Sequence, residues 1–132
     1  MPNYSREELA AARLDADATR AEWLIGITSD VLTVADLIEQ ARLDEGKPLR
    51  AITLRQLLLA QPRWGRLRVR STLAKLREAS GSDLPEKNLT VGWLIDSRYE
   101  HRNMLAWIDA MQKEDFAPWV GFPFSPAPEV AR

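Results

Sequence analysis

Signals that start and stop helices follow one another along this chain and leave little room for strands. Ser5 and Glu8 have the Ser-x-x-Glu spacing of a capping box, in which two side chains satisfy free N–H groups at a helix start. No Pro or Gly follows before Gly26, which predicts a first helix from residue 6 toward residue 29. The best strand-like run, Val91–Ile95, is short. These features predict an all-α fold that begins with a long N-terminal helix.

Later capping residues and breakers predict the remaining helices. Thr33 is expected to cap a second helix, which the Gly46–Lys47–Pro48 segment stops. Thr53 is expected to cap a short third helix that ends before Pro62. That third helix is predicted over Leu54 to Ala60, and a fourth over Arg66 to Ala79, with Gly81 past its end. A turn-rich stretch is expected from Ser80 to Ile95. Ser97 and Glu100 are expected to cap a fifth helix that ends near Lys113. The predicted organisation is N-terminal helices over residues 1–50, a helical domain over residues 51–113 and an irregular tail over residues 114–132.

The composition excludes several kinds of site. The chain has no Cys, which rules out disulfides, cysteine catalysis and zinc sites built on thiolates. A single histidine, His101, leaves no multi-histidine metal site, and no recognisable nucleophile motif accompanies it. We therefore expect neither an enzyme nor a cofactor. The segment MPNYSREELA lacks the apolar stretch of a secretory signal, and no apolar run approaches the ~20 residues of a membrane helix, so a cytoplasmic protein is expected.

Charge is unevenly distributed along the chain, although the formal net charge is −1. Residues 1–47 carry 5 Lys/Arg and 10 Asp/Glu, residues 48–80 carry 8 and 1, and residues 81–132 carry 5 and 8. Clustered charge sets the local field that attracts a polyanion. Arginine, which suits bidentate contacts with phosphate, accounts for 14 of the 18 basic residues.

The most basic stretch reads QPRWGRLRVR and contains a predicted helix start. Gly65 would let the backbone come close to a phosphate, just before a helix whose first N–H groups are free. At 3.6 residues per turn, Arg66, Arg70 and Arg77 share one stripe of that helix. The core-facing side is predicted to consist of Val69, Leu73 and Leu76, with Arg68 and Lys75 pointing elsewhere. The alternative is that these arginines pair with the acidic N-terminal segment inside the fold.

Several short segments between Thr19 and Met111 occur in an order typical of a known family. They are Arg20–Ala21–Glu22, Asp36–Leu37–Ile38, Leu57–Leu58 and the run from Pro62 to Arg68, followed by Pro85, Lys87, Leu89, Gly92 and Arg98. In these segments the chain resembles the actinobacterial integration host factor family, all-helical nucleoid proteins with a helix-two-turns-helix motif. The resemblance places that motif in the domain of residues 51–113. The Arg-rich, Ala/Leu-rich composition is typical of a GC-rich genome, of an actinobacterium or its phage.

The resemblance implies sequence-tolerant binding of double-stranded DNA, with bending or compaction, support of recombination and association with the nucleoid. Together with the arginine stripe, it predicts a DNA-binding set of Arg63, Trp64, Gly65, Arg66, Arg68, Arg70, Arg77, Lys87 and Arg98. Two roles are open for Trp64, namely a wedge between base steps and a plug over the core.

A different class of function is kept as the alternative: a protein-interaction module with the same fold and weak DNA affinity. Asn88 and Thr90 stand where the family has an arginine-rich loop, and acidic segments flank the basic one. In the tail, Trp119, Phe122 and Phe124 lie among prolines, as in a peptide that docks in a groove. The groove would belong either to this chain's own core or to a protein partner.

Overall fold

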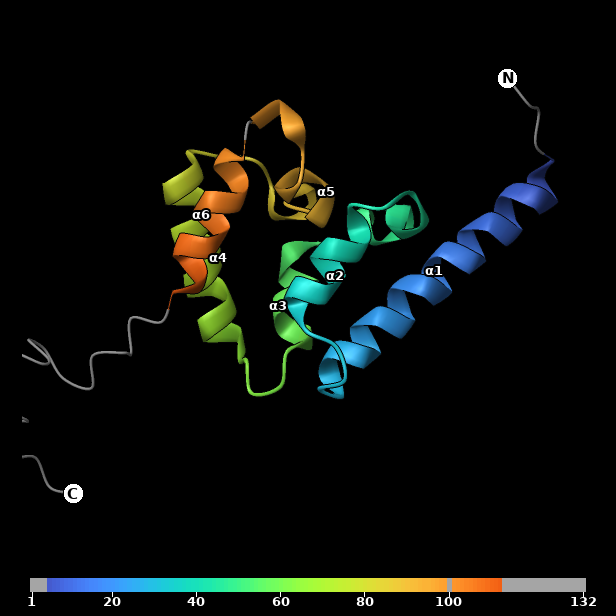
Figure 1. Cartoon of the computed structure of the whole chain (residues 1–132), viewed down its shortest axis with the longest axis horizontal. Coiled ribbons are helices and arrows are strands. Elements are labelled where there is room, and N and C mark those ends of the chain that lie inside the picture. Colours follow the sequence, from blue (N-terminus) through green and yellow to red (C-terminus); the bar gives the residue numbers. More distant parts are fainter. Residues whose placement is uncertain (1–4, 100, 113–132) are drawn as a thin grey trace, which may run out of the picture.

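The computed structural model describes residues 5–99 and 101–112, and this part of the chain is built from helices and turns (Figure 1). The α-helices are α1 (Arg6–Thr28), α2 (Val34–Ala41), α3 (Leu54–Ala60), α4 (Arg66–Ser80), α5 (Val91–Leu94) and α6 (Arg102–Met111). The 3₁₀ helices are η1 (Asp44–Ala51), η2 (Glu86–Asn88) and η3 (Ser97–Tyr99). No strand occurs among the described residues, where Thr53 and Thr90 form an isolated bridge. The predicted all-α fold with a long N-terminal helix is confirmed.

Three helix starts are capped by the residues that the sequence pattern indicated. Ser5, Thr33 and Thr53 each accept a hydrogen bond from the backbone N–H three residues later. In each case the side-chain oxygen of the third helix residue accepts a hydrogen bond from the backbone N–H of the cap, which completes a capping box. Gly81 ends α4 in the left-handed region with φ of 69°, as predicted for a glycine past a helix end.

Other predicted boundaries were wrong. Ser97 does not cap the last helix, because its N-terminal neighbour Asp96 accepts the N–H of Arg98 and holds residues 97–99 in the 3₁₀ turn η3. The last helix begins later, at Arg102 after His101, and is anchored by the buried Asn103, whose Nδ2 donates to the carbonyl of Trp93 at 2.9 Å. Glu100 lies outside the described residues.

The Gly46–Lys47–Pro48 segment, which was expected only to stop the second helix, is itself part of a 3₁₀ helix. Helix α2 ends earlier, at Ala41, and the chain then forms η1, in which Gly46 and Leu49 are buried. Arg50 ties η1 back to α2, since its Nε donates to the carbonyl of Ala41 at 2.7 Å. Similarly, the apolar run at residues 91–95 forms the short helix α5 instead of a turn.

The core lies where α2, α3, α4, α5 and α6 meet. Its fully buried large side chains are Ile27, Leu37, Leu49, Ile52, Leu54, Leu57, Leu58, Val69, Leu76, Leu89, Val91 and Leu94. Helix α4 packs along α6, and the C-terminal part of α1 packs on η1 and α3 (Figure 1). This packing fixes α3 and α4 relative to each other and leaves the turn between them at one end of the molecule.

Helix α1 reaches well beyond this core (Figure 1). Residues 6–15 are all exposed, including Leu9 at 44% and Leu14 at 70%. Charged residues are scattered along α1. Of the helices in the described part of the chain, none combines the length and the apolar character needed to cross a bilayer.

Candidate nucleic-acid interface

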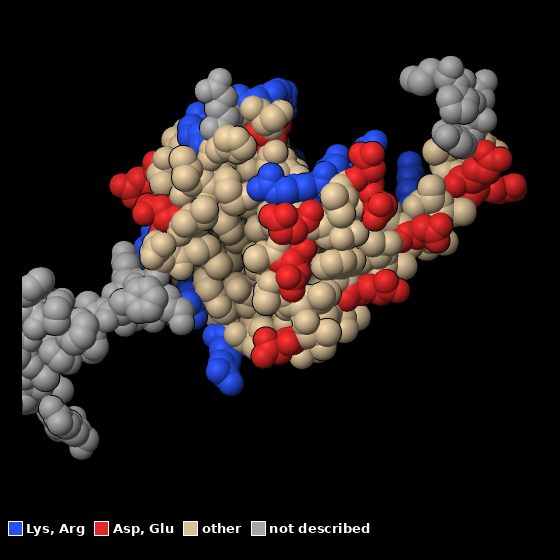
Figure 2. Space-filling view, viewed as in Figure 1, with Lys and Arg blue, Asp and Glu red and all other residues tan. Residues whose placement is uncertain are grey.

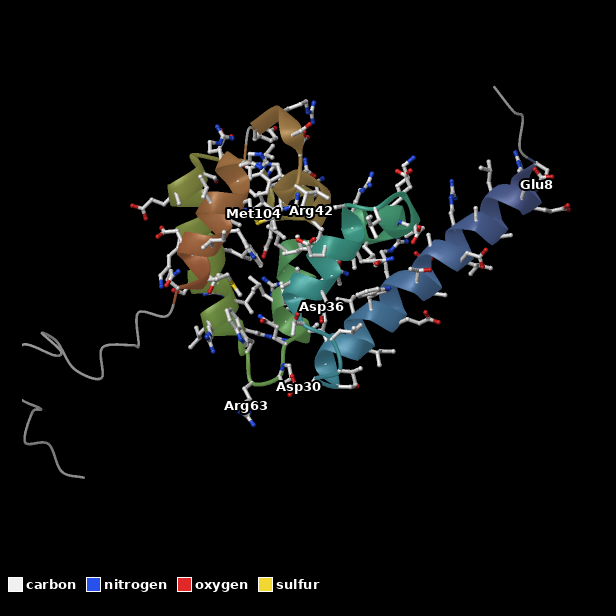
Figure 3. The ribbon with its side chains drawn as sticks, viewed as in Figure 1. Glu8, Asp30, Asp36, Arg42, Arg63 and Met104 are labelled. Carbon is white, nitrogen blue, oxygen red and sulfur yellow. The ribbon has the colours of Figure 1, made fainter. Side chains whose placement is uncertain are left out.

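The connection between α3 and α4 is a tight turn at residues 61–65. The N–H of Trp64 donates to the carbonyl of Gln61 at 3.3 Å, and Arg63 takes a φ of 70°. Left-handed backbone is unfavourable for a residue with a Cβ, so Arg63 holds a strained conformation that points its side chain out of the turn (Figure 3). The turn thus presents Arg63 directly before the start of α4.

Gly65 is the N-cap of α4, and the backbone at this position does not require a glycine. Its φ is −89°, which any residue can adopt, and an ideal Cβ built there meets no atom within 4 Å. No side chain in the described part of the chain caps this helix start by a hydrogen bond. The first N–H groups of α4 therefore have no capping side chain among the described residues and lie beside a residue without a side chain, as close approach of a phosphate would require.

Trp64 packs against the core, which corresponds to the second of its two predicted roles. The ring is partly buried, and the guanidinium of Arg68 lies over it at 3.8 Å from the ring centroid. This cation–π contact holds Arg68 half-buried against the turn. Arg68 therefore lies apart from the stripe formed by Arg66, Arg70 and Arg77.

That stripe borders a hollow of about 340 Å³ between α4, α3 and η2. Arg70 and Arg77 line it from α4, and Arg55 lines it from the first turn of α3. Glu86 of η2 completes the wall, with one carboxylate oxygen 3.1 Å from Nη1 of Arg55. The adjoining face of α4 is buried through Val69, Leu73 and Leu76, as predicted, and Leu73 also lines the hollow. Three arginines and one carboxylate leave this hollow with a surplus of positive charge.

With the exception of Arg55, the arginines at the turn and along the stripe have no carboxylate partner within the described part of the chain. In this part of the chain, arginine salt bridges join Arg20 to Asp17, Arg42 to Glu39, Arg55 to Glu86 and Arg98 to Asp96. Arg63, Arg66, Arg70 and Arg77 form no salt bridge with any described residue. The alternative in which these arginines pair with the acidic N-terminal segment is therefore not what the structure shows.

Sequence reasoning missed Arg55. It belongs to the same basic segment, but its contribution depends on α3 folding back alongside α4, which no local pattern reveals. Helical periodicity relates only residues of the same helix, so the stripe on α4 could not indicate a residue on α3. We refer below to Arg55, Arg63, Gly65, Arg66, Arg70 and Arg77 as the α3–α4 surface.

Two residues of the predicted DNA-binding set, Lys87 and Arg98, lie outside α3, α4 and the turn between them. Lys87 is exposed in η2, next to Glu86 and therefore near the hollow. Arg98 lies in η3, at the opposite end of the molecule from the turn at residues 61–65 (Figure 1). Its guanidinium donates to both oxygens of Asp96, at 3.1 and 2.7 Å, and this hydrogen bonding lowers the pKa of the Asp96 carboxyl. Arg98 is thus paired with a carboxylate and remote from the α3–α4 surface.

Acidic residues gather elsewhere. Figure 2 shows them along α1 and α2 on the viewed face, in keeping with the charge pattern of residues 1–47. Basic side chains lie among these carboxylates, and two of them, Arg20 and Arg42, form salt bridges with Asp17 and Glu39.

Comparisons of the chain with protein-family models, with curated proteins and with solved structures gave no match. Among residues 5–99 and 101–112, no three His, Cys, Asp or Glu side chains are grouped so as to hold a metal ion. The tail residues Trp119, Phe122 and Phe124 lie outside the described part of the chain. Charge, shape and exposure of the α3–α4 surface are thus the observations that bear on function.

Proposed function

We propose that this chain binds double-stranded DNA with little sequence preference, through phosphate contacts from the α3–α4 surface. The observation that carries the proposal is the group of arginines at and after the turn, Arg63, Arg66, Arg70 and Arg77, which lack carboxylate partners among the described residues. Unpaired guanidinium groups next to uncapped backbone N–H groups are suited to phosphate oxygens. Phosphate contacts carry no sequence information, so we expect sequence-tolerant binding.

The length of the surface favours a polyanion over a small anion. Arg66 and Arg77 are eleven residues apart on α4, or about 16 Å at a rise of 1.5 Å per residue. A single phosphate reaches one part of such a row. Duplex DNA carries about one charge per 1.7 Å of its axis and can contact the whole row at once.

A titration of fluorescent duplexes of two unrelated sequences, followed by anisotropy at several salt concentrations, tests the proposal. With four to six phosphate contacts, the slope of log affinity against log salt should be about −4 to −5. Similar affinities for both duplexes are expected. Absence of binding at low salt would rule out DNA as the ligand, and strong preference for one duplex would contradict a phosphate-based contact.

Gly65 provides a substitution that separates folding from binding. Gly65→Ala should leave the free energy of unfolding within about 0.5 kcal/mol of the parent, because the new methyl group meets no atom of the described residues within 4 Å. The same methyl should hold a phosphate away from the start of α4 and lower DNA affinity about tenfold, the worth of one charge-assisted hydrogen bond. Urea denaturation and the anisotropy titration measure the two effects. Unchanged affinity would show that no phosphate approaches Gly65.

DNA bending is part of the same proposal and is supported by the resemblance to the integration host factor family. Bound duplexes labelled at both ends would then show increased energy transfer relative to free duplexes. A straight bound duplex would restrict the function to coating DNA without bending it.

A second candidate function is a protein-interaction module. It is favoured by the acidic residues along α1 and α2 and by an apolar groove between α2 and α6. Under this function the basic surface would contribute little, and duplexes would remain unbound even at low salt. The anisotropy titration therefore also distinguishes the two candidates.

A further inference from the structure

An apolar groove of about 640 Å³ runs between α2 and α6, away from the α3–α4 surface. Its apolar lining comes from Val34 and Ile38 of α2 and from Met104, Trp107, Ile108 and Met111 of α6. Figure 3 shows Met104 and Arg42 on its two sides. Arg42 and Glu39 form an exposed salt bridge beside it, with 3.7 Å between Nε and Oε1.

The groove is open in the described part of the chain. Ile108 is 50% exposed, and Met104 and Met111 are only partly buried, although all three are apolar residues of a helix packed on the core. Apolar side chains left exposed beside one another in a groove are suited to the docking of an apolar segment. A groove lined by flexible Met side chains accepts bulky apolar groups readily.

The last described residue, Gln112, lies at the edge of this groove. Gln112 both lines the groove and ends α6, with the extended backbone angles φ −62° and ψ 132°. Twenty residues, 113–132, follow and contain Trp119, Phe122 and Phe124 together with four prolines. We propose that this tail docks in the α2–α6 groove of its own chain, with the three aromatic side chains as anchors.

Chain length permits this docking. Trp119 is seven residues beyond Gln112, so an extended chain reaches about 23 Å. Helix α6 has 10 residues and is therefore about 15 Å long. The tail can accordingly turn back and place Trp119 at any point along the groove.

Energetic arguments favour the chain's own tail over another occupant. A short tether gives the tail an effective concentration of the order of millimolar at the groove, whereas a free partner must reach that concentration in solution. Proline-rich segments lose little conformational entropy on binding, because their extended conformation is already restricted. Each aromatic ring can bury about 150–250 Å², which is ample for a groove of this size.

Bimane fluorescence tests the proposal in the full-length chain, because bimane is quenched on contact with Trp. The chain has no Cys, so Ala35→Cys, at an exposed position that lines the groove, provides a single labelling site. Adding Trp119→Phe to the labelled protein should raise bimane emission about twofold, while any quenching by Trp107 stays the same in both proteins. A matched label at the exposed Ala51, which does not line the groove, should show no change.

A second variant guards against a local effect of the label. Phe122→Ala with Phe124→Ala retains Trp119 but removes two anchors, so it should also raise the emission of the label at position 35. Unchanged emission in both variants would overturn the proposal. Quenching that increases with protein concentration would overturn it as well, because the groove would then hold the tail of a second copy.

Discussion

Replacing Arg66 and Arg70 together with alanine is expected to weaken duplex binding by roughly 50-fold at about 0.1 M salt. Each phosphate contact contributes about 0.9 to the salt slope, so the loss of two contacts should reduce that slope by about two. Both side chains are exposed and form no salt bridge with a described residue, so the fold should be unaffected. Anisotropy titrations over a range of salt concentrations measure the slope, and circular dichroism checks the helical content.

A charge-matched control is available on α1. Arg6→Ala with Arg13→Ala removes the same two positive charges from exposed positions remote from the α3–α4 surface. This control should keep the parent salt slope to within one unit. Equal losses in the two double variants would attribute binding to net charge alone, and parental affinity in the Arg66/Arg70 variant would remove the surface from the mechanism.

The largest effect on stability is expected from Gly46→Ala. Gly46 is buried in η1, and an ideal Cβ there would lie 1.8 Å from the carbonyl oxygen of Gln40 and 3.0 Å from Cα of Ala41. Both are backbone atoms, which cannot rotate aside as a side chain can. The end of α2 must then separate from η1, and we expect the free energy of unfolding to fall by about 3 kcal/mol, the upper range for overpacking. Urea denaturation followed by circular dichroism gives the value.

Gly65→Ala is the matched control, because it makes the same chemical change where a Cβ has no neighbour. The two variants together isolate steric contact from the entropy that any Gly→Ala change removes from the unfolded chain. A Gly46→Ala protein as stable as the Gly65→Ala protein would mean that α2 and η1 separate without cost, contrary to their close packing.

Local chemistry explains which parts of the fold and site were predictable. The caps at Ser5, Thr33 and Thr53 depend on bonds spanning three residues, and the stripe on α4 depends on the period of one helix. The hollow was not predictable, because Arg55 reaches it through the packing of α3 beside α4. The position of Arg98 at the far end of the molecule was not predictable for the same reason, whereas its pairing with Asp96 is a local contact that the family-based choice overlooked.

The start of α6 shows a conflict between two local signals. Ser97 had the spacing of a capping box, but a neighbouring carboxylate at Asp96 captured the N–H of Arg98 and fixed a turn instead. Burial of Asn103 against Trp93 then decided where the helix begins. Tertiary contacts of this kind override a sequence signal that is sound on its own.

The projecting half of α1, residues 6–15, is expected to be locally less stable than the core helices. Among the described residues, hydrogen bonds from the α1 side chains to the rest of the chain begin at Arg20, whose Nη1 donates to the carbonyl of Pro48 at 3.2 Å. A stretch of about ten residues is too short to persist as an isolated helix in water, so residues 6–15 depend on their cap and on continuity with the anchored half. Their amides can exchange with solvent through fraying from the N-terminal end, whereas those of α3 and α4 exchange only when the core opens. A protease can therefore shorten this arm without unfolding the body that carries the basic surface.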